Sequence, residues 1–256
     1  MAFSFERKMY EFSSRIRYSE TDSNEQLNIF GIANYFQDCS NMQSEDLGGG
    51  IDILHEKNMT WVLCSWNIEV RRYPKLGEYV TVGTFPYEYK GYFGKRNYYM
   101  KDETGNIIAC ADSLWSLINY DTGHAMRIPE EIASVYTVEP PLEMEYIKGK
   151  ILLPEKLDLC GEIKVLPHHL DANMHVNNAR FLEMVLDVVP DKLLSDKSFT
   201  NTEDASAISY PSRLRTEYRS MAKKDETLNI YAGKYEDKNI IVLKNNDNIC
   251  TMVEMK

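Results

Sequence analysis

The chain carries an internal repeat, the feature that most narrows what it can fold into. Residues 66–78 read WNIEVRRYPKLGE and residues 214–226 read LRTEYRSMAKKDE. Four positions match in register: Glu69 with Glu217, Arg71 with Arg219, Lys75 with Lys223, and Glu78 with Glu226. A second match, DSNEQLN from residue 22 and DANMHVN from residue 171, has the same offset to within one residue. Two independent matches in the same order predict that the second half duplicates the first.

Both halves also predict the same order of elements: an Asp-containing loop, a helix and then several strands. Helices are expected at residues 32–44 and 178–189. The second has an apolar stripe at helical spacing, made by Phe181, Leu182, Val185, Leu186 and Val189. Asn177 suits the N-cap of this helix, and Pro190 suits its end.

Strand-like runs follow each helix and predict an α+β fold with antiparallel strands. They lie at 60–71, 79–87, 94–101 and 107–117 in the first half, and at 214–218, 227–235, 240–244 and 250–255 in the second. The polar runs at 102–106 and 245–248 are typical of hairpin turns. Because Pro140-Pro141 and mixed charges lie between the halves, we predict domains at 1–136 and 160–256 and a linker at 137–159.

Length, charge and cysteine usage exclude several classes of protein. The 256 residues are enough for one large domain or two ordinary ones. The formal net charge of −10 argues against a nucleic-acid binder, which is normally basic. No apolar stretch of membrane-spanning length occurs, and the N-terminus lacks the apolar run of a signal peptide. The five cysteines form no CxxC pair, so we expect free thiols, a reducing compartment and a cytoplasmic location.

The strongest local signal for chemistry is the segment PHHLDANMHVNNARF. Asp171, Asn173 and His175 lie at alternate positions, which face one way in an extended or gently turned loop. Attack of water on a carbonyl carbon needs a base or nucleophile, a group that polarises the carbonyl and a group that orients the others. A carboxylate, an amide and an imidazole can supply these roles, so we predict that the three residues are catalytic.

The start of the second predicted helix adds a candidate oxyanion site. Backbone N–H groups are free at a helix N-terminus, and those of Val176 and Asn177 would be the donors. The alternative is that these Asp and Asn residues serve only as turn and cap residues, as they commonly do. His168 and His169 are interpreted as surface or structural residues. No HxxxH pair lies on a helix and no cysteine joins these histidines, so no metal site is predicted.

The first half has lost the imidazole, because Gln26 stands where His175 stands. A neutral amide cannot take a proton near neutral pH, whereas an imidazole can. We therefore expect the second half to keep the chemistry and the first half to supply an acyl pocket. Residues 29–36 and 61–66 are apolar enough to line it, although the same residues would also suit a plain core.

Several motifs occur together in one order along the chain. They are the DxNxHVNN loop with its helix and a later EYR segment, the run KGYFGKRNYYMKDETGNIIACADSLWSLIN, and RIP at 127–129. In this combination the chain resembles the plant and bacterial acyl-acyl carrier protein (acyl-ACP) thioesterases, from about Arg15 onward. The resemblance implies two tandem hot-dog domains, each a central helix wrapped by an antiparallel β-sheet. It also implies hydrolysis of acyl-ACP to free fatty acid with no cofactor, and matches Asp171, Asn173 and His175 to the family's catalytic loop.

One family motif is not kept. Plant members have EYRREC where this chain has EYRSMA, so the family's catalytic Glu and once-proposed nucleophilic Cys fall on Met221 and Ala222. Neither side chain can act as base or nucleophile. Two routes stay open: Asp171 and His175 activate a water, or Asp171 attacks the carbonyl directly and forms an anhydride. Glu183, on the predicted helix, is a fallback carboxylate.

An acidic acyl carrier protein, the partner implied by the resemblance, would need a local basic patch on this acidic chain. The candidate groups are Arg71, Arg72 and Lys75; Lys90, Lys95 and Arg96; and Arg213, Arg215, Arg219, Lys223 and Lys224. Alternative functions are an acyl-CoA thioesterase of the same fold, a dehydratase or hydratase acting on a hydroxyacyl thioester, and a non-catalytic acyl-thioester-binding protein. Both a monomer and a homodimer are compatible with the duplicated chain.

Overall fold

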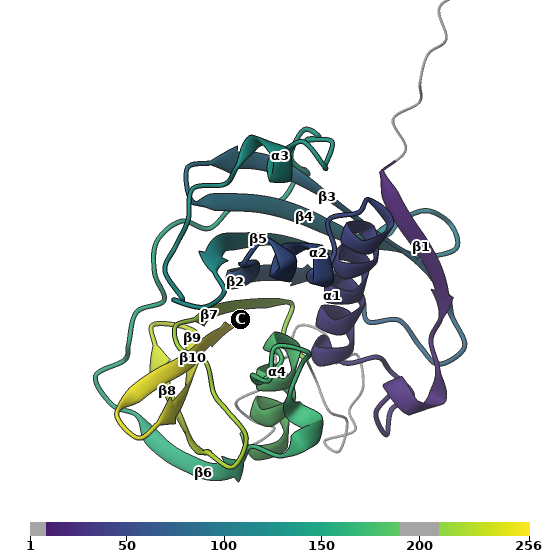
Figure 1. The fold of residues 1–256 in the computed structure, drawn as a ribbon. Helices are drawn as coiled ribbons and strands as arrows, with labels where there is room; N and C mark the ends of the chain where they lie inside the picture. Colours follow the sequence, from purple (N-terminus) through teal and green to yellow (C-terminus); the bar gives the residue numbers. More distant parts are fainter. Residues whose placement is uncertain (1–8, 190–209) are drawn as a thin grey trace, which may run out of the picture.

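The two halves of the protein share a framework of one long helix and five strands in the same order (Figure 1). The computed structural model describes residues 9–189 and 210–256, so the predicted helix end at Pro190 lies outside the described residues. The first half has β1 (Tyr10–Arg15), α1 (Ile29–Asp46), β2 (Met59–Val70), β3 (Tyr79–Lys90), β4 (Phe93–Lys101) and β5 (Ile107–Asn119). The second half has β6 (Asp158–Lys164), α4 (Asn178–Val188), β7 (Arg213–Tyr218), β8 (Thr227–Tyr235), β9 (Lys238–Asn245) and β10 (Asn248–Met255).

All ten described strands form one antiparallel sheet in the order β1-β3-β4-β5-β2-β7-β10-β9-β8-β6. The second half repeats the first in this order. From one end to the centre the strands are β1, β3, β4, β5 and β2, and from the other end to the centre they are the repeat equivalents β6, β8, β9, β10 and β7. The halves meet at the centre, where β2 pairs with β7. Each half therefore contributes five strands, and the predicted duplication is confirmed as a pseudo-twofold arrangement about the β2–β7 pair.

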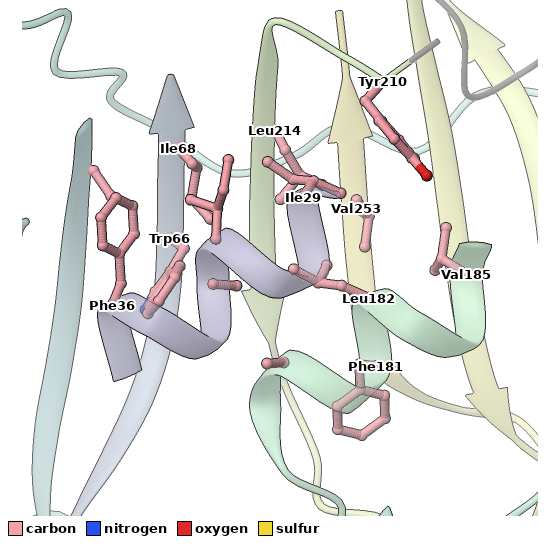
Figure 2. Packing of buried hydrophobic residues seen from close by; sticks show 14 of the residues in the cluster. Ile29, Phe36, Trp66, Ile68, Phe181, Leu182, Val185, Tyr210, Leu214 and Val253 are labelled. Atoms are coloured by element: carbon pink, nitrogen blue, oxygen red, sulfur yellow. The ribbon is translucent and has the colours of Figure 1, made fainter. Parts of the chain in front are cut away.

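Helices α1 and α4 lie against the inner face of the curved sheet and contact each other (Figure 1). Their apolar faces share one core with both halves of the sheet. Figure 2 shows Ile29 of α1 near Leu182 of α4 and Leu214 of β7, and Trp66 of β2 beside Phe36 of α1. Burying large apolar side chains of this kind contributes roughly 1.5–3 kcal/mol each, so neither half is expected to be stable without the other.

The predicted helices and all eight predicted strands are confirmed, with ends that differ by a few residues. The strands β1 and β6 were not predicted; they lie at the two ends of the sheet and present few apolar side chains. Two short helices, α2 (Ile51–Glu56) and α3 (Glu130–Ala133), were not predicted either. Segments of this length are too short for helical periodicity to show.

The segment between α3 and β6, which includes the predicted linker except for its last two residues, is packed along the outer face of the sheet. The side-chain amide of Asn67 on β2 donates to the carbonyl of Glu145 at 2.9 Å, and Arg215 on β7 donates to the carbonyl of Gly149 at 2.9 Å. Tyr146 donates to the Asn97 side chain at 3.0 Å. These bonds tie the connection to strands of both halves.

Two further predictions concern cysteines and membrane spans. All five cysteines are unpaired. In the ranges 9–189 and 210–256, no helix has both the length and the apolar character needed to cross a bilayer.

Candidate active site

The loop before α4 is held by one aspartate. The Oδ1 atom of Asp171 accepts the backbone N–H of Asn173 at 2.8 Å and that of His175 at 3.4 Å. The Asp171 N–H in turn donates to the carbonyl of His175 at 2.9 Å. Met174 takes a left-handed conformation, with φ of 61°, to close the turn. The sequence folds locally in this way because an aspartate side chain readily accepts N–H groups a few residues ahead of it.

The first half contains the same loop, built on Asp22. The Oδ1 atom of Asp22 accepts the N–H of Asn24 at 2.8 Å and that of Gln26 at 3.0 Å. This loop is filled rather than open. Tyr210 donates its hydroxyl to the second oxygen of Asp22 at 2.8 Å, and the buried ring of Tyr73 packs against Tyr210. Both carboxylate oxygens of Asp22 are therefore bound by groups of the protein itself.

The second-half loop opens onto a cavity of about 420 Å³. Asp171, Asn173 and His175 all line it, so the three predicted residues are brought together at one cavity. Within the described residues, neither the His175 imidazole nor the second oxygen of Asp171 has a hydrogen-bond partner. Both groups are therefore free to take a proton from, or bind, a molecule in the cavity.

Two further cavities continue from this one into the first half. A cavity of about 230 Å³ shares Asp171, Asn173 and Trp61 with the first, and one of about 60 Å³ lies beyond it. Trp61 lines all three. The prediction that 61–66 lines a pocket therefore holds for Trp61, with Val62 and Leu63 beside it.

The prediction for residues 29–36 as pocket wall is wrong. Ile29, Ile32 and Phe36 are fully buried in the core and line none of these cavities. Their side chains face the sheet and α4, while the next turns of α1 supply the cavity wall. Polar residues of those turns, such as Asn41 and Ser44, line the two inner cavities.

The predicted oxyanion donors are also wrong. The N–H of Val176 donates to the carbonyl of Ala222 at 2.9 Å, and the N–H of Asn177 donates to the carbonyl of His169 at 2.9 Å. Both are used to attach the loop to its neighbours. Asn177 instead caps α4 through its side chain, which accepts the N–H of Ala179 at 2.9 Å. In the described part of the chain, the N–H of Asn178, the first helical residue, has no acceptor, and Asn178 lines both larger cavities.

The remaining titratable candidates have structural partners. His169 is buried and accepts the N–H of Leu166 through Nδ1 at 3.0 Å. Burial lowers the pKa of this imidazole. Glu183 forms an ion pair with Arg180 at 2.7 Å and lines none of the three cavities. Both residues therefore stabilise the region without facing the cavity.

The two positions that depart from the family motif differ in exposure. Met221 is 48% exposed and lines the largest cavity, while Ala222 is fully buried. By the repeat, Tyr73 is the first-half equivalent of Met221. A buried tyrosine thus fills the closed copy of the site, where a methionine leaves the other copy open.

One functional candidate was missed by sequence reasoning. His55, on α2 of the first half, places its Nε2 atom 3.1 Å from Oδ1 of Asn173. The two residues are far apart in the chain, and a lone histidine in LHEKN carries no motif. Only the packing of α2 beside the second-half loop brings them together.

Most of the predicted basic groups are not free. Six form ion pairs: Arg72 with Glu78, Lys95 with Glu88, Arg213 with Glu69, Arg215 with Glu254, Arg219 with Glu217, and Lys224 with Asp225. Arg96 is buried. Among the described residues, Arg71, Lys75, Lys90 and Lys223 have no carboxylate partner.

The fold is that of known acyl-ACP thioesterases. Over 96% of both chains it superposes on an acyl-ACP thioesterase from Bacteroides thetaiotaomicron with a TM-score of 0.81 and 22% identity. The 12:0-ACP thioesterase from Umbellularia californica matches with a TM-score of 0.80 and 20% identity, over 97% of this chain and 96% of that one. Each half is a helix wrapped by an antiparallel sheet, so the protein has a double hot-dog fold.

Sequence profiles identify the family. The acyl-ACP thioesterase N-terminal domain matches residues 7–136, and the acyl-ACP thioesterase C-terminal domain matches residues 155–251. The chain therefore belongs to the acyl-ACP thioesterase family. It is 26% identical to oleoyl-acyl carrier protein thioesterase 1 of Arabidopsis thaliana over 70% of its length, and 26% identical to a palmitoyl-acyl carrier protein thioesterase of Gossypium hirsutum over 83%. It spans about half the length of these relatives, 54% and 52% respectively.

Proposed function

We propose that this protein hydrolyses the thioester of an acyl-acyl carrier protein and releases the free fatty acid and the carrier thiol. The observation that carries the proposal is the shared cavity of Asp171, Asn173 and His175, with the His175 imidazole free of hydrogen bonds to the described residues. Membership of the acyl-ACP thioesterase family supports the substrate. The adjoining cavities in the first half give the acyl chain an apolar wall at Trp61.

The proposed reaction is attack of water on the thioester carbonyl. A base in the cavity takes a proton from water as its oxygen bonds to the carbonyl carbon, which gives a tetrahedral oxyanion. The oxyanion collapses, the carbon–sulfur bond breaks, and the thiolate takes up a proton. The free N–H of Asn178, at the positive end of α4, suits the role of oxyanion donor better than the occupied N–H groups of Val176 and Asn177.

Either His175 or Asp171 can be the group that starts the reaction. An imidazole suits proton transfer near neutral pH, so His175 is the expected base and Asn173 the residue that orients the reacting groups. The alternative is direct attack by the unpartnered oxygen of Asp171. A single turnover in oxygen-18 water tests the second route. Label in the Asp171 carboxylate supports an anhydride that water opens at the Asp171 carbonyl, and its absence leaves direct water attack as the expected route.

The proposed partner is an acyl carrier protein. Arg71, Lys75, Lys90 and Lys223 are the cations best placed to attract an acidic partner, because the other predicted basic groups are paired or buried. Five unpaired cysteines support a reducing compartment such as the cytoplasm. A homodimer remains a prediction, which analytical ultracentrifugation would test.

The test is thiol or fatty-acid release from a series of acyl chains, each supplied on acyl carrier protein and on CoA. Wild type is compared with His175→Ala. Release from the carrier protein that is lost in the variant supports both the reaction and the site. Faster release from CoA would favour an acyl-CoA thioesterase. Binding of an acyl thioester without any release would favour a non-catalytic acyl-binding protein.

A further inference from the structure

The contact between His55 and Asn173 joins the two halves of the protein inside the candidate site. Nε2 of His55 lies 3.1 Å from Oδ1 of Asn173, and this amide oxygen can only accept a hydrogen bond. His55 therefore donates through Nε2–H. The backbone N–H of Asn173 is already bound to Asp171 at 2.8 Å. Asn173 is thus held at its main chain by its own loop and at its side chain by the other half.

This bond decides which way the Asn173 amide faces. An amide has an acceptor end and a donor end, and rotation by half a turn exchanges them. With Oδ1 turned toward His55, the NH₂ group is left for other partners, and none of the described residues accepts from it. Since Asn173 lines both larger cavities, its donor end is available to a carbonyl or water bound there.

His55 is itself held on two sides. Its ring packs on the ring of Tyr120, with centroids 4.2 Å apart, and Tyr120 lines the largest cavity. The preceding residue, Leu54, is buried against Met59 and Leu117 and so anchors α2 to the first-half sheet. The position of the imidazole is therefore set by the first half of the protein and not by the loop that it contacts.

We propose that His55 is a positioning residue, which fixes the amide of Asn173 so that its NH₂ group donates into the cavity. It acts on the reaction only through Asn173. The inference rests on the proposed function for its kinetic consequence, although the orientation of the amide can be measured without turnover. It also gives the first half, whose own loop is closed, a direct part in the site of the second half.

The first experiment compares His55→Ala, His55→Gln and Glu56→Ala with wild type in acyl-ACP hydrolysis. Loss of the donor is expected to lower kcat by about 10–100-fold, by analogy with the removal of hydrogen-bond partners that orient metal ligands, with KM nearly unchanged. Glutamine keeps an N–H donor at a similar reach and is expected to restore most of kcat. Glu56 is exposed on the same helix, so Glu56→Ala controls for damage to α2.

The second measurement follows the side-chain NH₂ resonance of Asn173 by ¹⁵N–¹H NMR, assigned by its loss in Asn173→Asp. We expect His55→Ala to shift or broaden this resonance and His55→Gln to keep it near its original position. If wild type shows no thioesterase activity, the proposed function fails while this readout still tests the positioning. An unchanged resonance together with an unchanged kcat in His55→Ala would overturn the inference, as would a loss that His55→Gln does not restore.

Discussion

Asn67 and Arg215 occupy equivalent positions in the two halves and lie opposite each other in the β2–β7 pair. The pseudo-twofold axis of the molecule passes between them. It relates the pair Ser65–Glu217 to the equivalent pair Arg213–Glu69 on the other side of the axis. Both side chains at the axis bind the connecting segment on the outer face of the sheet. The connection between the halves is thereby packed at the point where the halves pair.

The ion pair of Arg215 is expected to be important for stability. Arg215 is 9% exposed and lies 3.2 Å from Glu254, which is 7% exposed. Removing one member of a buried pair leaves the other charge poorly compensated, at a cost of about 3–5 kcal/mol. Lys238 also contacts Glu254, so we expect Arg215→Ala to lower the free energy of unfolding by about 2–4 kcal/mol. Urea unfolding measures this, and a loss below about 1 kcal/mol would contradict it.

Replacing His175 is expected to abolish most of the hydrolysis. A positioned general base contributes about 10²–10⁴-fold, so His175→Ala should reduce kcat for acyl-ACP by that factor with little change in unfolding free energy. The matched control is Glu183→Gln, because Glu183 is paired with Arg180 outside the cavities. Equal losses in both variants would argue against the assignment of the base.

Met221 stands where the resemblance to the plant members implies a catalytic Glu, so its replacement tests whether this position takes part in the reaction. A thioether cannot accept a proton, so Met221→Ala should change kcat by less than about 10-fold, less than removal of a positioned base. KM is expected to change more than kcat, because the half-exposed side chain lines the cavity. Steady-state kinetics on acyl-ACP measures both constants. A loss as large as that of His175→Ala would show that Met221 has a role that its chemistry does not predict.

Tyr73 is a difference between the closed copy of the site and the open one, where Met221 takes its place. Its buried hydroxyl donates to the carbonyl of Pro211 at 2.7 Å. Tyr73→Phe leaves that carbonyl without its donor, and we expect a loss of about 1–3 kcal/mol in unfolding free energy. Because the ring packs against Tyr210 beside the first-half loop, kcat at 25 °C should stay at the wild-type value. A parallel fall in kcat would indicate that the closed loop contributes to catalysis.

Asp112 predicts a pH dependence of stability. Burial raises the pKa of this carboxyl to about 6, although the Tyr87 hydroxyl donates to it at 2.8 Å. Between the unfolded pKa near 4 and the folded pKa near 6, the folded state binds the proton that the unfolded state releases. Stability therefore falls as pH rises through this window, and the cost is fully present above it.

Asp112→Asn removes this cost and keeps an oxygen for Tyr87. Relative to wild type, the variant should gain about 1–3 kcal/mol more at about pH 8 than at about pH 4. Urea unfolding at both pH values measures the difference. The same relative stability at both values would contradict a buried, raised-pKa carboxyl at this position.

Much of the fold could be predicted because its signals are local and occur twice. The stripe from Phe181 to Val189 predicted α4, and strand-like runs predicted the central strands. The edge strands β1 and β6 were missed because residues on them bury little apolar surface. The three loop residues were found because turn, cap and imidazole lie within a few positions of one another.

By itself, the sequence determined the duplication, the α+β class and the loop that carries Asp171, Asn173 and His175. Those features depend on periodicity and on contacts a few residues apart. Only the tertiary structure decided that the N–H groups of Val176 and Asn177 are occupied and that His55 reaches Asn173. Such contacts join atoms distant in the chain, and they are set by strand register and by the pairing of β2 with β7, which no local pattern encodes.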